Sequence, residues 1–163
     1  MHMLLIADTT PLSLLATIPG ALDWLFAPGC QVWMSDIIHD DVLHCDEIAD
    51  WLQTNRYRIK RLETRIGRRY AAETRNYQNA LALWERVGSP ADLEPEPPER
   101  RDRGDESVWV GVCIAEAVLA TGECVIALAD DDNVKAALEA RGRQKIKVMD
   151  TRTFIEWHKW RSR

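Results

Sequence analysis

The sequence predicts an α/β fold, in which helices cover both faces of a central, mainly parallel sheet in three layers, α/β/α. Short apolar runs of strand length alternate with longer segments of helix length along the whole chain. Strands and helices that alternate in this way form parallel sheets, because each helix serves as the crossover between two strands. A length of 163 residues with 46% hydrophobic residues suits one domain with a complete core.

The first part of the chain supplies three of the predicted strands. Pro19 and Gly20 interrupt a helical segment, and Ser35 or Asp36 can cap the next helix. In chain order we expect a strand at 4–7, two short helices within 12–27, a strand at 31–34, a helix from 35 or 36 to about 52, and a strand at 56–63.

The second part of the chain supplies two more strands and an insertion. Residues 88–103 contain four prolines and mixed charges, so we expect a long loop there. In chain order we expect a helix at 68–87, this loop, a helix at 106–120, a strand at 124–129, a helix at 132–140, a strand at 145–149 and a helix at 151–160. The chain is thus one domain, 1–163, with an insertion of helix and proline-rich loop at about 64–103.

The charge and the apolar runs limit the class of protein. With 21 basic and 26 acidic residues, the net charge is −5, which argues against a protein that coats nucleic acid through charge alone. No apolar run approaches the roughly 20 residues of a membrane span, and no export signal opens the chain. We therefore expect a soluble, cytoplasmic protein without a membrane partner.

Residues 56–75 form a strongly basic segment, with eight basic residues against two acidic ones and with tyrosines in or beside it. Basic and aromatic side chains together are typical of a surface that binds single-stranded nucleic acid. An edge strand and a solvated helix face that carry charges against aggregation would give the same composition. Candidate RNA-binding residues are Arg56, Arg58, Lys60, Arg61, Arg68 and Arg69.

Acidic residues follow two of the apolar strands. Asp8 comes directly after the first strand, where it is either a helix cap or a site residue. Three consecutive acids, 130–132, follow the strand at 124–129. Capping needs only one of them, and three carboxylates in a row repel one another unless a cation is near. Both clusters fall at the carboxyl edge of one parallel sheet.

Two further acidic positions lie on predicted helices. A helical wheel places Asp41 within the apolar stripe of its helix and Asp40 well outside it. A carboxylate on such a stripe must be paired, hydrogen-bonded or bound to a metal, since its burial alone costs several kcal/mol. Asp105 and Glu106 occupy the first turn of an apolar helix, where acids complement the helix dipole. Periodicity does not choose between these two.

Together these motifs resemble the PIN domain family of metal-dependent ribonucleases. The resemblance rests on I-A-D-T-T-P-L-S-L-L, on D-V-L in an early helix, on G-D-E-S at the start of a buried helix, and on A-L-A-D-D-D-N-V-K after a strand. It spans residues 3–53 and 103–155 in the order of the family. The opening D-T-T-P-L-S-L-L, followed by A-L-D-W-L-F, particularly resembles toxin-type bacterial members.

The resemblance implies an acidic quartet and a divalent cation, Mg²⁺ or Mn²⁺. The implied quartet is Asp8, Asp41, Asp105 and Asp131, of which Asp8, Asp105 and Asp131 hold the metal while Asp41 helps to order its bound water. The implied supporting residues are Thr9, Ser107, Glu106 and Asp130. The chain departs from the family in having Asp where Glu is more usual at 41 and 105, and Ala129 where a hydroxyl residue is usual.

We therefore expect a metal-dependent endoribonuclease, the toxin of a toxin–antitoxin pair, with RNA as substrate, a small antitoxin as partner and a homodimeric state. The presence of Asp rather than Glu at 41 and 105, together with Ala129, supports an alternative. In it the protein is a PIN-like binding or assembly module with weak or no catalytic activity. A phosphatase that forms an aspartyl-phosphate is disfavoured, because it requires D-x-D after the first strand and this chain has D-T-T.

Overall fold

A computed structural model describes residues 3–87, 104–140 and 145–163, and its centre is a five-stranded parallel sheet. The strand order is β3-β2-β1-β4-β5, and every neighbouring pair is parallel. The strands are β1 (Met3–Ala7), β2 (Cys30–Ser35), β3 (Ile59–Leu62), β4 (Cys124–Leu128) and β5 (Ile146–Met149). The predicted α/β fold is confirmed.

The centre of the sheet is apolar on both faces. Strands β1 and β4 are buried along their whole lengths, and Leu5 pairs with Val32 on one side and Ile126 on the other. Strands covered on both faces read as continuous apolar runs rather than alternating ones, which is why these segments are recognisable in the sequence. The chain first builds outward from β1 to β3 and then returns to place β4 on the other side of β1.

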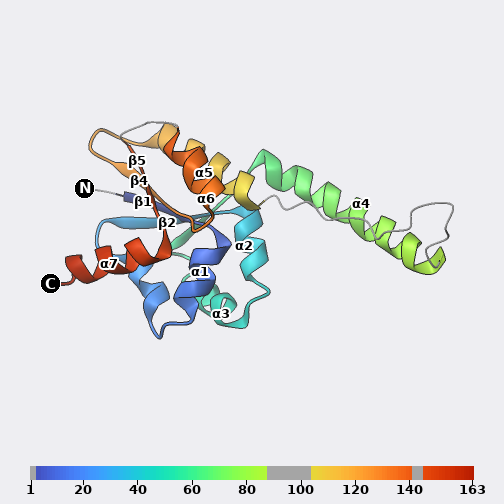
Figure 1. Cartoon of the computed structure of the whole chain (residues 1–163), viewed down its shortest axis with the longest axis horizontal. Helices are drawn as coiled ribbons and strands as arrows, with labels where there is room; N and C mark the ends of the chain where they lie inside the picture. Colours follow the sequence, from blue (N-terminus) through green and yellow to red (C-terminus); the bar gives the residue numbers. More distant parts are fainter. Residues whose placement is uncertain (1–2, 88–103, 141–144) are drawn as a thin grey trace.

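Helices cover both faces of the sheet (Figure 1). One layer holds α5 (Gly104–Val118), which packs on β1, β2 and β4, and α6 (Asp132–Glu139), which packs on β5. The other layer holds α1 (Thr9–Ala16), the 3₁₀ helix η1 (Ala21–Phe26), α3 (Asp46–Thr54) and α7 (Thr151–Arg161). The short helix α2 (Asp36–Val42) starts at the carboxyl end of β2 and packs against α5.

The expectation of one helix from residue 35 or 36 to about 52 is wrong, because the chain forms α2 and α3 with a break between them. Leu43 is largely exposed, and Cys45 has extended backbone angles. In one straight helix Val42 and Ile48 would point about 120° apart, whereas with the break both are fully buried. The acids Asp46 and Glu47 suit the first turn of the new helix.

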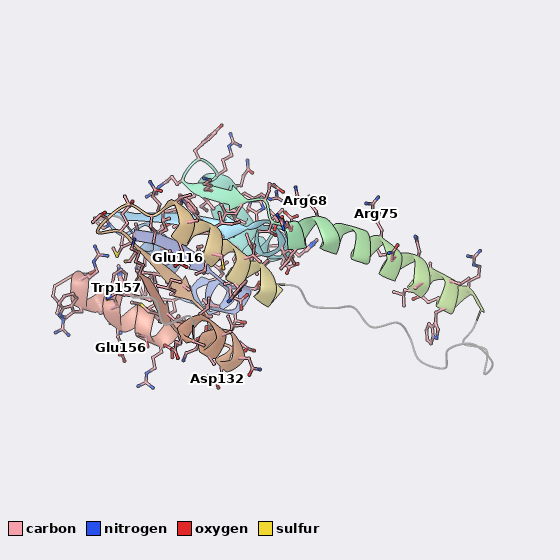
Figure 2. All side chains as sticks on the ribbon, turned by 90° about the horizontal axis from the view of Figure 1, so that it is seen from above. Arg68, Arg75, Glu116, Asp132, Glu156 and Trp157 are labelled. Carbon is pink, nitrogen blue, oxygen red and sulfur yellow. The ribbon has the colours of Figure 1, made fainter. Side chains whose placement is uncertain are left out.

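Helix α4 (Arg65–Val87) leaves the carboxyl edge of the sheet and projects away from the body (Figure 1). Its 23 residues correspond to about 34 Å at 1.5 Å per residue. Arg68 lies where the helix leaves the body and Arg75 lies farther out (Figure 2). The loop expected at 88–103 lies outside the described residues. No helix in the described ranges has the length and apolar character that a membrane crossing requires.

Candidate metal site at the carboxyl edge of the sheet

Asp8 lies at the point where the strand order reverses, between β1 and β4. Its backbone N–H donates to the carbonyl of Leu128, the last residue of β4, at 2.9 Å. Its side chain is 6% exposed, and Oδ1 accepts a hydrogen bond from the Thr9 N–H at 2.8 Å, so Asp8 also caps α1. Ligands of open parallel sheets bind in the crevice outside such a switch point. Asp8 therefore both caps α1 and occupies the position at which a ligand site is expected.

The three acids after β4 have separate environments. Asp130 accepts hydrogen bonds from both the backbone N–H and the hydroxyl of Thr151, which ties the end of β4 to the start of α7. Asp131 caps α6, with Oδ1 accepting from the N–H groups of Asn133 (2.8 Å) and Val134 (3.1 Å). Asp132 is exposed in the first turn of α6. Hydrogen bonds to the first two thus offset part of the repulsion within the run.

Buried hydroxyls fix the start of α5 at the same edge. Ser107 is fully buried, and its Oγ lies 2.8 Å from the Oγ of Ser35, the last residue of β2. Gly111, one turn further on, lies over Leu62 and Ile6, which brings α5 close to the sheet. The backbone of Asp105 lies in the first turn of α5, while the side chains of Asp105 and Glu106 lie outside the described part of the structure.

Sequence reasoning missed Asp36 as anything other than a helix cap. This carboxylate is 4% exposed and accepts hydrogen bonds from the N–H of Ile37 (2.9 Å), the N–H of Thr64 (2.9 Å) and the hydroxyl of Thr64 (2.8 Å). Thr64 Oγ1 accepts in turn from the Gly67 N–H at 2.9 Å, which caps α4. Asp36 therefore joins the end of β2 to the start of α4. The only local signal was its position after a strand.

The two adjacent acids of α2, Asp40 and Asp41, differ in burial in the direction that the helical wheel predicts. Asp41 is half-buried, whereas the side chain of Asp40 is 60% exposed. Asp40 forms an ion pair with Arg61 at 3.1 Å and lies 3.3 Å from Nδ1 of His39. Asp41 thus lies on the inner side of α2, the helix that packs against α5.

The basic residues of this segment differ in the contacts that the described part of the structure shows. Arg61 forms ion pairs with Asp40 and Glu63. Along and before the edge strand β3, basic groups lie against aromatic rings: Arg56 over Tyr57, Arg58 over Phe26 at 3.9 Å and Lys60 over Trp33 at 4.3 Å. Arg65 and Arg68 belong to the first turn of α4. The side chain of Arg69 lies outside the described part.

The residues at this edge fit a divalent cation in their donor chemistry. Carboxylate oxygens are the ligands that Mg²⁺ and Mn²⁺ prefer, and Asp8 and Asp131 follow two adjacent strands. Among the side chains that the structure describes, no three His, Cys, Asp or Glu residues are grouped to hold a metal ion. The side chains of Asp105 and Glu106 lie outside the described part.

The fold defines the structural class of the protein. The chain has a Rossmann-like α/β fold with sheet order 3-2-1-4-5, consistent with a three-layer PIN-like fold, and it carries carboxylates at its topological switch point. No protein-family model matches the chain, and no curated protein matches it significantly. The comparisons thus identify no family.

Proposed function

We propose that the protein is a divalent-metal-dependent endoribonuclease of the PIN type, the toxin of a toxin–antitoxin pair. The observation that supports this proposal is that Asp8 and Asp131 follow two adjacent strands, β1 and β4, at the switch point of the sheet. The first turn of α5 is held at the same edge through the contact of Ser107 with Ser35. The order of these acids along the chain matches the family that the sequence resembles. RNA is the proposed substrate, and a small antitoxin and a second copy of the chain are the proposed partners.

The proposal assigns distinct roles to the acids at the edge. Asp8, Asp105 and Asp131 hold Mg²⁺ or Mn²⁺, and Asp131 Oδ2 is available because no described group donates a hydrogen bond to it. When bound, the cation supplies Lewis acidity toward water and balances negative charge on the phosphodiester. Asp41 orients the attacking water from α2.

Supporting residues hold these acids in place. Asp130 anchors the turn after β4 through Thr151, and Thr9 donates its backbone N–H to Asp8. Ser107 anchors the start of α5 through Ser35, so it fixes the backbone that carries Asp105 and Glu106. Ligands held by such outer contacts keep their orientation when a cation binds.

A binding or assembly module without turnover is the second candidate. Both oxygens of Asp130 and both oxygens of Asp36 already accept hydrogen bonds, so these two carboxylates serve the fold. The shorter Asp at 41 and 105 also gives each of these acids less reach than Glu. A PIN-like shell without bound metal would have these properties.

An RNA cleavage assay on Asp8→Asn tests the first candidate against the second. Asn is as good a helix cap as Asp, so the variant should keep its fold while losing the negative charge that a cation requires. We expect cleavage in Mn²⁺ to fall by at least about 100-fold, the lower range for loss of a catalytic group. Asp132→Asn, an exposed neighbour of the site, is the matched control and should retain activity. Equal cleavage by Asp8→Asn and the parent would exclude the assignment.

A further inference from the structure

A pocket of about 620 Å³ lies between the first turns of α4 and the middle of α5. Its lining residues are Glu63, Thr64, Arg65, Ile66, Arg68, Val110 and Ile114, and we call it the α4–α5 pocket. Its volume falls within the roughly 300–1,000 Å³ of small-ligand sites. Arg68 marks its position in Figure 2, where α4 leaves the body.

The α4–α5 pocket combines aliphatic walls with two arginine side chains. Ile66, Val110 and Ile114 are half-buried and supply the walls. Arg65 and Arg68 are exposed, and neither forms an ion pair with a carboxylate in the described ranges. The negative charge of Glu63 is paired with Arg61. The pocket therefore suits a ligand with an apolar, flat part and a negative part.

The α4–α5 pocket adjoins the acidic edge of the sheet. Thr64 lines the pocket, and its hydroxyl donates to Asp36 at the end of β2. Strand β1, which Asp8 directly follows, is the next strand beyond β2. Two strand spacings, about 10 Å, thus separate the end of β3 at the pocket from the end of β1. A polymer that lies across the edge can occupy both places at once.

We propose that the α4–α5 pocket binds one nucleotide of a single-stranded RNA next to the one that is cut, an inference that rests on the proposed ribonuclease function. The aliphatic walls cover the base, and Arg65 and Arg68 contact its phosphate. Unstacked bases of single-stranded RNA are the parts that proteins enclose in pockets and stack on guanidinium planes. The adjoining acids favour this ligand over an acidic peptide, because the phosphodiester needs the cation that they hold.

The test is RNA binding without cleavage. Fluorescence anisotropy of a fluorescein-labelled single-stranded oligoribonucleotide, titrated in EDTA at several salt concentrations, compares three full-length proteins. These are the parent, Arg65→Gln/Arg68→Gln, and the control Arg75→Gln/Arg86→Gln. The two control arginines are also exposed on α4, and neither lines the pocket. Arg75 lies farther out along the helix (Figure 2), and Arg86 lies in its last turn. Labelled poly-glutamate serves as the competing ligand class.

Loss of two phosphate contacts has a defined effect on salt dependence. Each contact to single-stranded nucleic acid contributes about −0.7 to the slope of log affinity against log salt, so Arg65→Gln/Arg68→Gln should flatten the slope by about 1.4 and weaken binding roughly 25-fold at 0.1 M salt. The control variant should keep the slope of the parent. Equal slopes for the two double variants, no RNA binding by the parent, or tighter binding of poly-glutamate than of RNA would each overturn the pocket assignment.

Because the metal is chelated, this result is separate from the test of cleavage. If the parent cleaves RNA in Mn²⁺ and the two double variants bind RNA alike, the pocket assignment is wrong and the ribonuclease proposal stands. If Arg65→Gln/Arg68→Gln alone loses affinity and the parent cleaves no RNA, the pocket is an RNA-binding site, and both the ribonuclease proposal and the position of the pocket beside a cut nucleotide are wrong.

Discussion

The carboxylate of Asp36 is buried, negatively charged and in contact with three hydrogen-bond donors from two parts of the chain. Donors of this kind replace the water that a buried charge loses. Both oxygens are engaged, so the carboxylate cannot rotate without breaking a hydrogen bond. Its position leaves no room beside Gly67, where an added Cβ would lie 1.9 Å from Oδ2.

Replacement of Gly67 should therefore destabilise the protein although alanine favours helices. Alanine in a helix interior is normally about 1 kcal/mol better than glycine, but the new methyl group would displace the Asp36 carboxylate and its hydrogen bonds. We expect Gly67→Ala to lower the free energy of unfolding by about 2 kcal/mol, as measured by urea denaturation.

Gly111→Ala is the matched control, because it also changes a helical glycine. Its added Cβ would lie 3.6 Å from Leu62 Cδ1, an ordinary van der Waals contact. We expect this variant to be as stable as the parent or slightly more stable. If Gly67→Ala also proved at least as stable as the parent, the tight packing of α4 on Asp36 would be refuted.

At the scale of elements, helix caps decide where several helices begin. Thr64 caps α4, which begins at Arg65 rather than at the expected residue 68, because the hydroxyl of Thr64 accepts from Gly67 while donating to Asp36. The position of Thr64 is visible in the sequence, but its buried acceptor lies 28 residues earlier in the chain. The local periodicity of the sequence does not reveal contacts between residues so far apart in the chain.

The cap of α7 makes a pH-dependent contribution to stability. Asp150 accepts hydrogen bonds from Thr153, and these, with a smaller contribution from Lys135, hold the pKa of its carboxyl below the ordinary value of 3.8. A lowered folded-state pKa stabilises the protein above the unfolded pKa, and this stabilisation is lost as the pH falls through the folded pKa.

We therefore expect Asp150→Ala to cost about 1 kcal/mol at neutral pH, and the difference from the parent to shrink below pH 3.8. Asp150→Asn keeps a capping oxygen but has no charge. Its difference from the parent therefore isolates the contribution of the carboxylate charge to stability. Urea denaturation across the acid range measures both variants. A difference between Asp150→Ala and the parent that stays constant from neutral to acid pH would contradict the role of the charge.

The run of three acids shows what sequence analysis resolves at this scale. Their place after β4 follows from the apolar run before them. The sequence could not show which of the three carboxylates is used in hydrogen bonds that hold the fold together. The partner of Asp130 is Thr151, which lies 21 residues further along the chain. The helical wheel correctly predicted that Asp41 is more buried than Asp40. It did so although it assumed one continuous helix, because Asp41 lies in α2, before the break.

At the scale of the whole molecule, the sequence predicted parallel strands, and the order of the strands needed the structure. Strands β1 and β4 lie more than 110 residues apart in the chain and are direct neighbours in the sheet. Their pairing creates the switch point, so Asp8 and the acids after β4 follow adjacent strand ends. Alternating elements indicate the fold class, but equally apolar strands such as these carry no local signal of which strand lies beside which.

The central claim is that these strand ends share one divalent cation. Isothermal titration calorimetry with Mn²⁺ and Mg²⁺ on the parent and on Asp8→Asn measures this directly. We expect that the parent binds the cation and that Asp8→Asn, with its fold intact, does not. A parent that binds neither cation, or an Asp8→Asn variant that binds as tightly as the parent, would contradict it.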